Sequence, residues 1–178
     1  MWNVNVPIDL DREDVHIVSG HEIRLRPVQV DDEAFLLHLF ASTRPEISML
    51  GWEPEQQDAF VQMQFEMQRR SFAMQYPNAE HSIVLCDGKP SGRLIVHRGE
   101  TFIDLTDISI SPTMRGRGIA SLVIGRLQAE SVAEEKELRL FVYAQNINAL
   151  NLYRKLGFVE SGKTEVGSHM RWTKDRDP

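Results

Sequence analysis

Arg115-Gly116-Arg117-Gly118-Ile119-Ala120 is a glycine loop that joins a strand pattern to a helix pattern. The strand pattern before it ends at Pro112, and the helix pattern after it continues through Leu127. A helix begins with backbone N–H groups that have no intrahelical acceptor, and the helix dipole adds partial positive charge at this end. The two glycines let the backbone approach a ligand closely, and the two arginines add donors that suit phosphate oxygens. The loop is therefore predicted to hold a phosphate-bearing ligand.

Two common kinds of phosphate loop do not fit this stretch. A nucleoside-triphosphate loop needs Lys and then Ser or Thr after its last glycine, and here Ile119 and Ala120 follow. A dinucleotide fingerprint needs a third glycine where Ser121 stands, and an acidic residue about twenty positions further on. Taken alone, a Gly-x-Gly turn is equally compatible with a plain helix entry. The interpretation of the loop therefore depends on a second signal.

That second signal lies at residues 146–158, which read Asn-Ile-Asn-Ala-Leu-Asn-Leu-Tyr-Arg-Lys-Leu-Gly-Phe. Together the two segments resemble the GNAT N-acetyltransferase superfamily, whose members move an acetyl group from acetyl-CoA to an amine. Residues 115–120 match its Gln/Arg-x-x-Gly-x-Gly/Ala pyrophosphate loop. Residues 146–158 match its Asn-x-x-Ala-x-x-Leu-Tyr-x-Lys-x-Gly-Phe signature at every specified position. The resemblance is strongest over residues 102–160, and it implies an N-acetyltransferase with acetyl-CoA as cosubstrate.

The pattern of the remaining chain predicts an α+β domain. The expected elements are, in chain order, a short strand at 15–18, a strand at 22–26, a helix beginning near Asp31, a helix at 54–76, strands at 82–86, 92–97 and 102–110, a helix at 116–134, a strand at 138–143, a helix at 149–156 and a final strand pair from 158 to about 172. The resemblance implies the GNAT fold, a mixed and mostly antiparallel sheet with helices on both faces. Its fourth and fifth strands splay apart to admit the pantetheine arm of CoA.

Composition is consistent with one cytoplasmic domain. The 178 residues are 42% hydrophobic, enough for one core, so residues 1–178 are expected to form a single domain, with 1–20 as an N-terminal extension or extra strand and a core at about 21–173. No apolar run is long enough to span a membrane, and the N-terminus lacks a signal-peptide layout. The single cysteine, Cys86, fits a reducing cytoplasm and is expected in the core. A net charge of −6 argues against a dedicated nucleic-acid binder.

The resemblance assigns the CoA-binding residues outside the loop. It places the backbone of Ile108, Ser109 and Ile110 beside the thioester, where an N–H group would stabilise the oxyanion of the tetrahedral intermediate. Asn146 has two interpretations that the sequence leaves open. It either caps the following helix or bonds the pantetheine amides.

The resemblance also assigns a catalytic acid, whereas the base stays open. Tyr153 occupies the position of the tyrosine that protonates the departing thiolate; the alternative is a ring that only packs. Asp104 lies where the resemblance places, in some family members, the glutamate that deprotonates the amine through water, and Asp107 is the other acid of this strand. Either could instead be a structural acid. Strand alternation places them on opposite faces, unless a bulge near Thr106 to Ile108 reverses the sense. Many relatives use no dedicated base.

Several further expectations concern the acceptor and the partners. The helix at 54–76 carries Phe60, Met63, Met67 and Met74 on one stripe, which is expected to be mostly core on the sheet, although the resemblance places this helix over the acceptor site. The six histidines have no ligand spacing, so no metal site is predicted. The final strands of the family often pair across a two-fold axis, and segment 164–173 is apolar enough to form a homodimer in this way, although the same pairing can equally be intramolecular. The alternative to an enzyme of unspecified amine acceptor is a non-enzymatic acyl-CoA-binding or interaction module.

Overall fold

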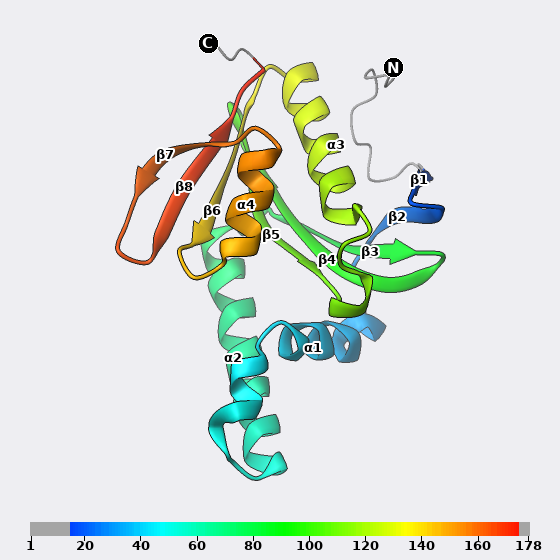
Figure 1. Cartoon of the computed structure of the whole chain (residues 1–178), viewed down its shortest axis with the longest axis vertical. Coiled ribbons are helices and arrows are strands. Elements are labelled where there is room, and N and C mark those ends of the chain that lie inside the picture. The colour runs from blue at the N-terminus through cyan, green and yellow to red at the C-terminus, as the bar shows by residue number, and fades with distance from the viewer. Residues whose placement is uncertain (1–14, 175–178) are drawn as a thin grey trace.

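The computed structural model describes residues 15–174. Its elements are shown in Figure 1. They are β1 (His16–Val18), β2 (His21–Pro27), η1 (Val30–Asp32), α1 (Glu33–Ser42), η2 (Pro45–Leu50), α2 (Pro54–Gln75), β3 (Glu80–Cys86), β4 (Lys89–Arg98), β5 (Phe102–Ile110), η3 (Pro112–Met114), α3 (Ile119–Ala133), β6 (Glu137–Tyr143), α4 (Ile147–Lys155), β7 (Val159–Lys163) and β8 (Gly167–Trp172).

The strands form one eight-stranded sheet in the order β1-β2-β3-β4-β5-β6-β8-β7. Only β5 and β6 are parallel, because α3 carries the chain from the end of one strand back to the start of the other. The predicted pairing of the N-terminal segment with the next strand is confirmed. Val18 pairs with His21, and the turn between them uses positive φ at Ser19 (51°) and Gly20 (80°). The α+β class predicted from the sequence is therefore correct.

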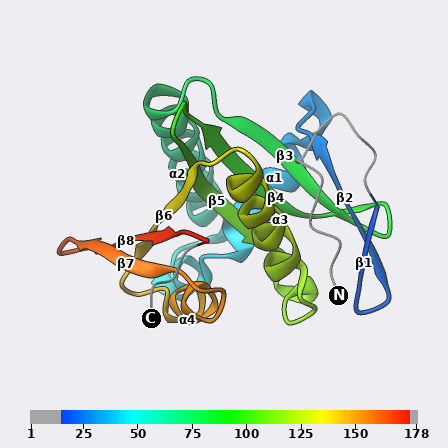
Figure 2. The same cartoon turned by 90° about the horizontal axis from the view of Figure 1, so that it is seen from above.

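Helices cover both faces of the sheet. Figure 2 places α2 on one side of β5, and α3 and α4 on the other. The main core lies on the α3 and α4 side, where residues such as Ile124 and Leu127 pack on alternate residues of the strands, among them Val84 and Leu140. On the opposite side, Phe40 of α1 meets Phe65 of α2 edge to face, with ring centroids 5.5 Å apart.

The splay that the resemblance places between the family's fourth and fifth strands occurs here between β5 and β6, because the short β1 adds one strand to the count. These strands pair only from Phe102–Glu137 to Leu105–Leu140. Beyond that point β5 continues to Ile110 beside β4, whereas β6 stays paired with β8 up to Tyr143. Figure 1 shows the two strands diverging, with α4 beside the opening.

Segment 164–173 takes the intramolecular alternative that the sequence allowed. Because β8 is an interior strand with β6 on one side and β7 on the other, its backbone cannot pair across a two-fold axis.

The expectation for the methionines of α2 was wrong. The methionines of α2 are not core: Met63, Met67 and Met74 are 49%, 61% and 79% exposed. Phe65 is the α2 residue that is buried, at 3% exposure. At the helical period, Met63, Met67 and Met74 lie on the side of α2 opposite to Phe65, so the stripe that they form faces solvent rather than the sheet. The first half of α2 also projects below the sheet in Figure 1.

Within residues 15–174, no helix is both long enough and apolar enough to cross a membrane.

Candidate active site

The loop before α3 has the backbone geometry of an anion site. Gly116 and Gly118 both have positive φ, 75° and 81°, which other residues rarely adopt. Gly118 is the N-cap of α3, and no side chain caps the helix. The N–H of Leu122 makes the first described helical bond, to the carbonyl of Gly118. The N–H groups of the preceding turn are thus directed at the space in front of the helix, where the dipole favours a negative ligand.

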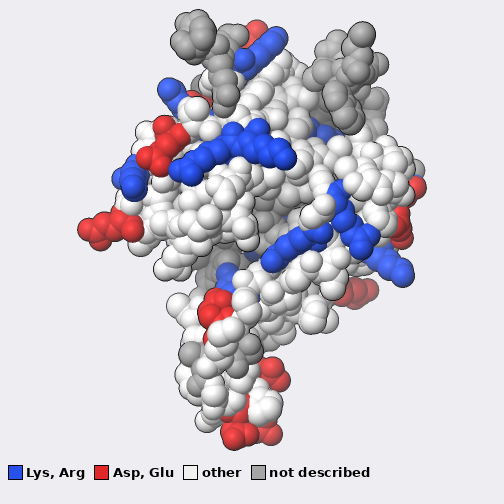
Figure 3. Space-filling model, viewed as in Figure 1, with Lys and Arg blue, Asp and Glu red and all other residues white. Residues whose placement is uncertain are grey.

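The two arginines of the loop are held in different ways. Arg115 is exposed, and its Nε donates to the carbonyl of Ile110 at 3.0 Å, which ties the loop to the end of β5. Arg117 is half-buried, and its Nη1 lies 2.6 Å from Nε2 of His21 on β2. In Figure 3, basic side chains lie over the loop between β5 and α3, beside a hollow in this face of the molecule.

The next two residues of the motif contribute only backbone. Ile119 is 2% exposed, and its side chain belongs to the core between α3 and the sheet. Ala120 is half-buried against the same core. The hydrophobic side chains therefore fix the start of α3, while the N–H groups of this turn remain available to a ligand.

The end of β5 presents backbone groups toward the splay. Just past the ladder with β4, the N–H of Ser111 donates to the carbonyl of Ser91 at 2.9 Å. Bond directions alternate along an antiparallel pair, so the N–H groups of Ile110 and Ile108 point away from β4. They face the side on which the described pairing with β6 has already ended at Leu105. Two backbone donors therefore line the opening beside the loop.

Tyr153 lies in the same region, on α4. It is 8% exposed, and its ring packs against Phe158 with centroids 5.7 Å apart. Burial raises the pKa of the Tyr153 hydroxyl well above its ordinary value, and the negative charge of Asp107 raises it further. The hydroxyl is therefore protonated at any pH that an enzyme assay uses.

Asn146 caps α4. Its Oδ1 accepts a hydrogen bond from the N–H of Ala149 at 3.2 Å. The sequence left open a helix cap and a contact with pantetheine, and the structure shows the helix cap.

The two candidate bases lie on the same face of β5. The register between β4 and β5 shifts between Ile95 and Val96, which leaves Thr106 as the extra residue of a bulge. The alternation of side chains between the two faces of β5 therefore reverses between Asp104 and Asp107. This is the bulge that the sequence left open as an alternative. The Thr106 hydroxyl is buried at this point and has no hydrogen-bond partner in the described part of the chain.

The partners of the two acids differ. Asp104 lies where β5 and β6 are still paired, and both its oxygens bind the guanidinium of Arg139. Asp107 lies beyond the start of the splay, and its Oδ2 accepts from Arg93 and from the Ser109 hydroxyl, at 3.0 and 3.2 Å. The charge of Asp107 contributes to the raised pKa of Tyr153. Of the two acids, Asp107 is the one that lies past the paired part of β5 and β6, where the splay begins.

Sequence reasoning missed the polar side chains around Asp107. Arg93 of β4 also donates to Gln68 of α2 at 3.0 Å, which connects the sheet to that helix. His81 of β3 and Asp107 both pair with Ile95, so they share one row of the sheet. Burial lowers the pKa of His81, and the positive charge of Arg93 lowers it further. Only the strand register brings these residues together, and no spacing in the sequence reveals it.

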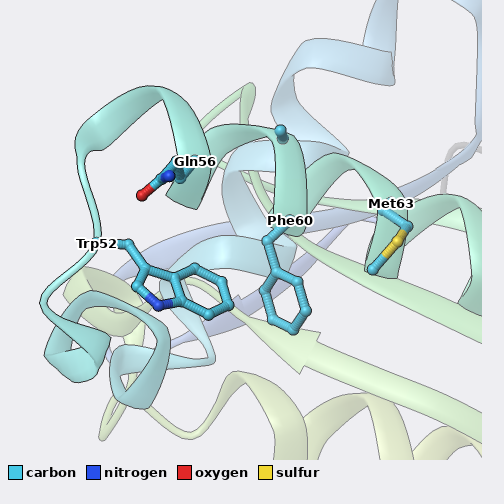
Figure 4. A pocket seen from close by; sticks show the side chains of 5 residues that line it. Trp52, Gln56, Phe60 and Met63 are labelled. Atoms are coloured by element: carbon cyan, nitrogen blue, oxygen red, sulfur yellow. The ribbon is translucent and has the colours of Figure 1, made fainter.

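A shallow apolar pocket lies on the projecting part of α2. Its lining comprises Trp52, Gln56, Ala59, Phe60 and Met63 (Figure 4). Trp52 and Phe60 meet edge to face, with ring centroids 5.2 Å apart. None of the loop residues, and neither aspartate nor Tyr153, contributes to this pocket. It is therefore separate from the opening between β5 and β6.

One side-chain group near the loop also has no signature in the sequence. His21, Cys86 and Asp87 bring one polar or sulfur atom each to within 4.8 Å of one another. His21 is already hydrogen-bonded on both ring nitrogens, to Asp87 and to Arg117, so we assign this group to a hydrogen-bond network.

Comparison with known proteins places this site in a family. The family model described as "Acetyltransferase (GNAT) family" matches residues 36–158. The spermidine N(1)-acetyltransferase of Escherichia coli (strain K12) is 29% identical over 154 residues, which cover 82% of this chain and 77% of that protein.

Solved structures show the same fold at lower identity. The PaiA N-acetyltransferase of Thermoplasma acidophilum, crystallised with coenzyme A, superposes with a TM-score of 0.61 at 16% identity, over 84% of this chain and 97% of that one. The N-acetyltransferase PseH of Campylobacter jejuni, crystallised with acetyl coenzyme A, gives a TM-score of 0.55 at 14% identity, over 86% and 99%. The family match covers most of the chain and both sequence signatures. The chain therefore belongs to the acetyltransferase (GNAT) family, which makes it an acyltransferase with acetyl-CoA as its cosubstrate.

Proposed function

We propose that the chain is a cytoplasmic N-acetyltransferase that moves the acetyl group directly from acetyl-CoA to a primary amine in a ternary complex. The observation that carries the proposal is the end of the β5–β6 pairing at Leu105, which leaves the last part of β5 open beside the loop that starts α3. The start of α3, which no side chain caps, and the buried Tyr153 of α4 support it. Cys86, the chain's one cysteine, is buried and free, which is consistent with a reducing compartment.

The cosubstrate binds along this opening. The pyrophosphate of CoA takes the N–H groups of residues 116–120, with Arg115 beside them, since this is the positive end of α3. The pantetheine arm takes the open edge of β5 at Ile108–Ile110, and the thioester then lies near the N–H groups that face the splay. One of these stabilises the oxyanion when the amine attacks the carbonyl carbon.

Tyr153 supplies the proton for the departing thiolate. The hydroxyl is protonated over the whole assay range because burial raises its pKa. A donor that is always protonated needs no prior proton uptake. Because a thiol titrates at about 8.5, transfer from a tyrosine of raised pKa is uphill, so the positive charge that the attacking amine acquires must lower the pKa of Tyr153 in the ternary complex.

We expect Asp107→Asn to impair acetylation most at low pH. Asp107 is the acid that lies beside the splay, and a carboxylate can take the proton of a charged amine through water. The kcat/KM of the variant should be lowered about tenfold or more below the pKa of the acceptor amine. It should recover as the pH rises through that pKa, because the free amine then needs no base. A pH profile with one acceptor measures this.

Asp104→Asn is the matched control, since it makes the same change on the same strand and the same face. It removes a charge from the Arg139 pair at the closed end of β5 and β6. We expect a lower melting temperature and a wild-type pH profile. If instead Asp104→Asn alters the pH profile and Asp107→Asn does not, Asp104 is the base.

The acceptor is a primary amine of a small molecule or a protein. The E. coli relative acts on spermidine, which makes a polyamine the first acceptor to test. A panel of polyamines, amino acids, amino sugars and peptides, incubated with acetyl-CoA, should yield one class of product heavier by one acetyl group in mass spectrometry. CoA binding without any acetylated product would support the non-enzymatic module instead.

We also propose a homodimer, formed by a surface other than β8. The apolar side of α2 is the surface with the composition of an interface, because Trp52, Met63 and Met67 are each more than 40% exposed. Light scattering should give a dimer mass, and Met67→Asp should shift it toward the monomer. A wild-type monomer mass at every concentration would remove the dimer.

A further inference from the structure

We infer that His21 is a positioning residue for CoA binding: held by Asp87, it fixes Arg117 and with it the glycine loop 115–120. The inference rests on the proposed placement of the CoA pyrophosphate on this loop. It adds that two turns distant in the sequence, the β1–β2 turn and the β3–β4 turn, hold the loop in place.

Three segments meet at the His21 ring. Nδ1 of His21 lies 2.7 Å from Oδ2 of Asp87, and Nε2 lies 2.6 Å from Nη1 of Arg117. Asp87 is itself fixed, because its Oδ1 accepts from the N–H of Glu22 at 2.8 Å. Asp87 and Gly88 form the two-residue turn between β3 and β4, both with positive φ. The tight turn thus fixes the backbone of Asp87, and the hydrogen bonds fix its side chain.

The two partners determine which ring nitrogen carries the proton. A carboxylate only accepts, so Nδ1 donates to Asp87. A guanidinium only donates, so Nε2 must offer a lone pair to Arg117. His21 is therefore neutral in this arrangement, with its proton on Nδ1. The bonds from His21 and from the Glu22 N–H also hold the pKa of Asp87 below its usual range.

The same hairpin holds the backbone of the loop. The hydroxyl of Ser19 donates to the carbonyl of Arg117 at 3.2 Å. A methyl carbon of Val18 lies 3.0 Å from the position that a side chain at Gly118 would occupy, so the hairpin packs closely against the N-cap of α3. A loop with two glycines at positive φ is entropically costly to order. Contacts that order it before CoA arrives lower the cost of binding.

The network predicts a response to acid. A protonated His21 would place an N–H against Arg117, so the hydrogen bond is lost and two positive charges face each other. The described groups around the ring are Asp87 and the Cys86 thiol from β3 and its turn, Arg117 from the loop, and Glu22, which binds Arg24 instead. Acid should therefore release Arg117 and weaken the hold on CoA.

The test measures CoA affinity by calorimetry in the full-length protein. At about pH 8, His21→Leu should bind CoA about three- to tenfold more weakly than wild type, whereas His21→Gln, whose amide oxygen can still accept from Arg117, should bind like wild type. His38→Leu is the matched control, because His38 is an exposed histidine on α1. In turnover, His21→Leu should raise the KM for acetyl-CoA and leave kcat at saturation near the wild-type value.

The pH arm separates positioning from simple packing. Between about pH 8 and about pH 5.5, wild type should lose about three- to tenfold more affinity than His21→Gln, which has no ring to titrate. Comparing variants at equal pH cancels the protonation of CoA's own phosphate monoester. Parallel pH dependences, or tighter binding by wild type in acid, would overturn the inference. If Gly118→Val lowers CoA affinity and His21→Leu does not, only the role of His21 is wrong. If neither variant lowers CoA affinity, the proposed CoA site at the loop is wrong.

Discussion

Gly118→Val should abolish CoA binding in a protein that still folds. Gly118 has a φ of 81°, where a β-branched residue is strained, and an added Cβ would lie 3.0 Å from the Val18 side chain. The loop must change conformation to relieve this strain, and the N–H groups at the start of α3 then no longer converge on one anion. We expect affinity to fall at least about a hundredfold, since several charge-assisted hydrogen bonds are lost together.

Thermal denaturation with and without CoA measures this effect. Ligand that binds only the folded state raises the melting temperature by mass action, so wild type should shift upward and Gly118→Val should not. Without CoA, the variant should melt only a few degrees lower, because strain of this kind costs about 1–3 kcal/mol. A full CoA-induced shift in Gly118→Val would remove the loop from the binding site.

Two other glycines are internal controls for this experiment. Gly116 has a φ of 75° but open space around it, so Gly116→Ala introduces backbone strain without a clash and should lose less affinity. Gly125 lies inside α3 with nothing within 4 Å of an added Cβ, so Gly125→Ala should leave CoA affinity unchanged. It should also stabilise the protein by roughly 0.4–1 kcal/mol, because alanine restricts the unfolded chain more than glycine does.

The elements that could be predicted are those specified by local signals. The strand at 102–110 was predicted with the bounds of β5, and the helix at 54–76 differs from α2 by one residue. A proline that ends an element and an aspartate–glycine turn each depend on only a few neighbouring residues, so a single sequence is enough to locate them. The same holds for the two motifs, since a glycine loop and a helix start are contiguous in the chain.

What could not be predicted depends on contacts between distant segments. The bulge at Thr106 is a mismatch between β4 and β5, and it alone decides that Asp107 shares a face with Asp104. His21 and Arg117 are 96 residues apart, and only the order of strands and loops brings them to 2.6 Å. A helical methionine stripe looks the same whether it packs on a sheet or faces solvent, which is why the stripe of α2 was placed in the core.

Tyr153→Phe should separate chemistry from binding. The substitution keeps the ring that packs on Phe158 and removes only the hydroxyl, so fold and CoA affinity should stay within a few-fold of wild type. The loss of a general acid should lower kcat about ten- to a thousandfold. Because burial keeps the wild-type hydroxyl protonated throughout the assay range, the loss should be the same at every pH. That uniform loss distinguishes the acid from a base, whose removal matters least at high pH.

Tyr76→Phe is the matched control for this experiment. Tyr76 follows α2, is half-buried, and has a hydroxyl whose pKa burial also raises, but it lies near Asp104 at the closed end of β5 and β6. It should therefore lose no activity. Steady-state kinetics with the acceptor found by the panel, and calorimetry with CoA, measure both variants. If kcat is unchanged in Tyr153→Phe, the thiolate takes its proton from water and Tyr153 is a packing residue of α4. If kcat falls equally in both variants, the loss reflects the removal of a buried hydroxyl and not a role in proton transfer.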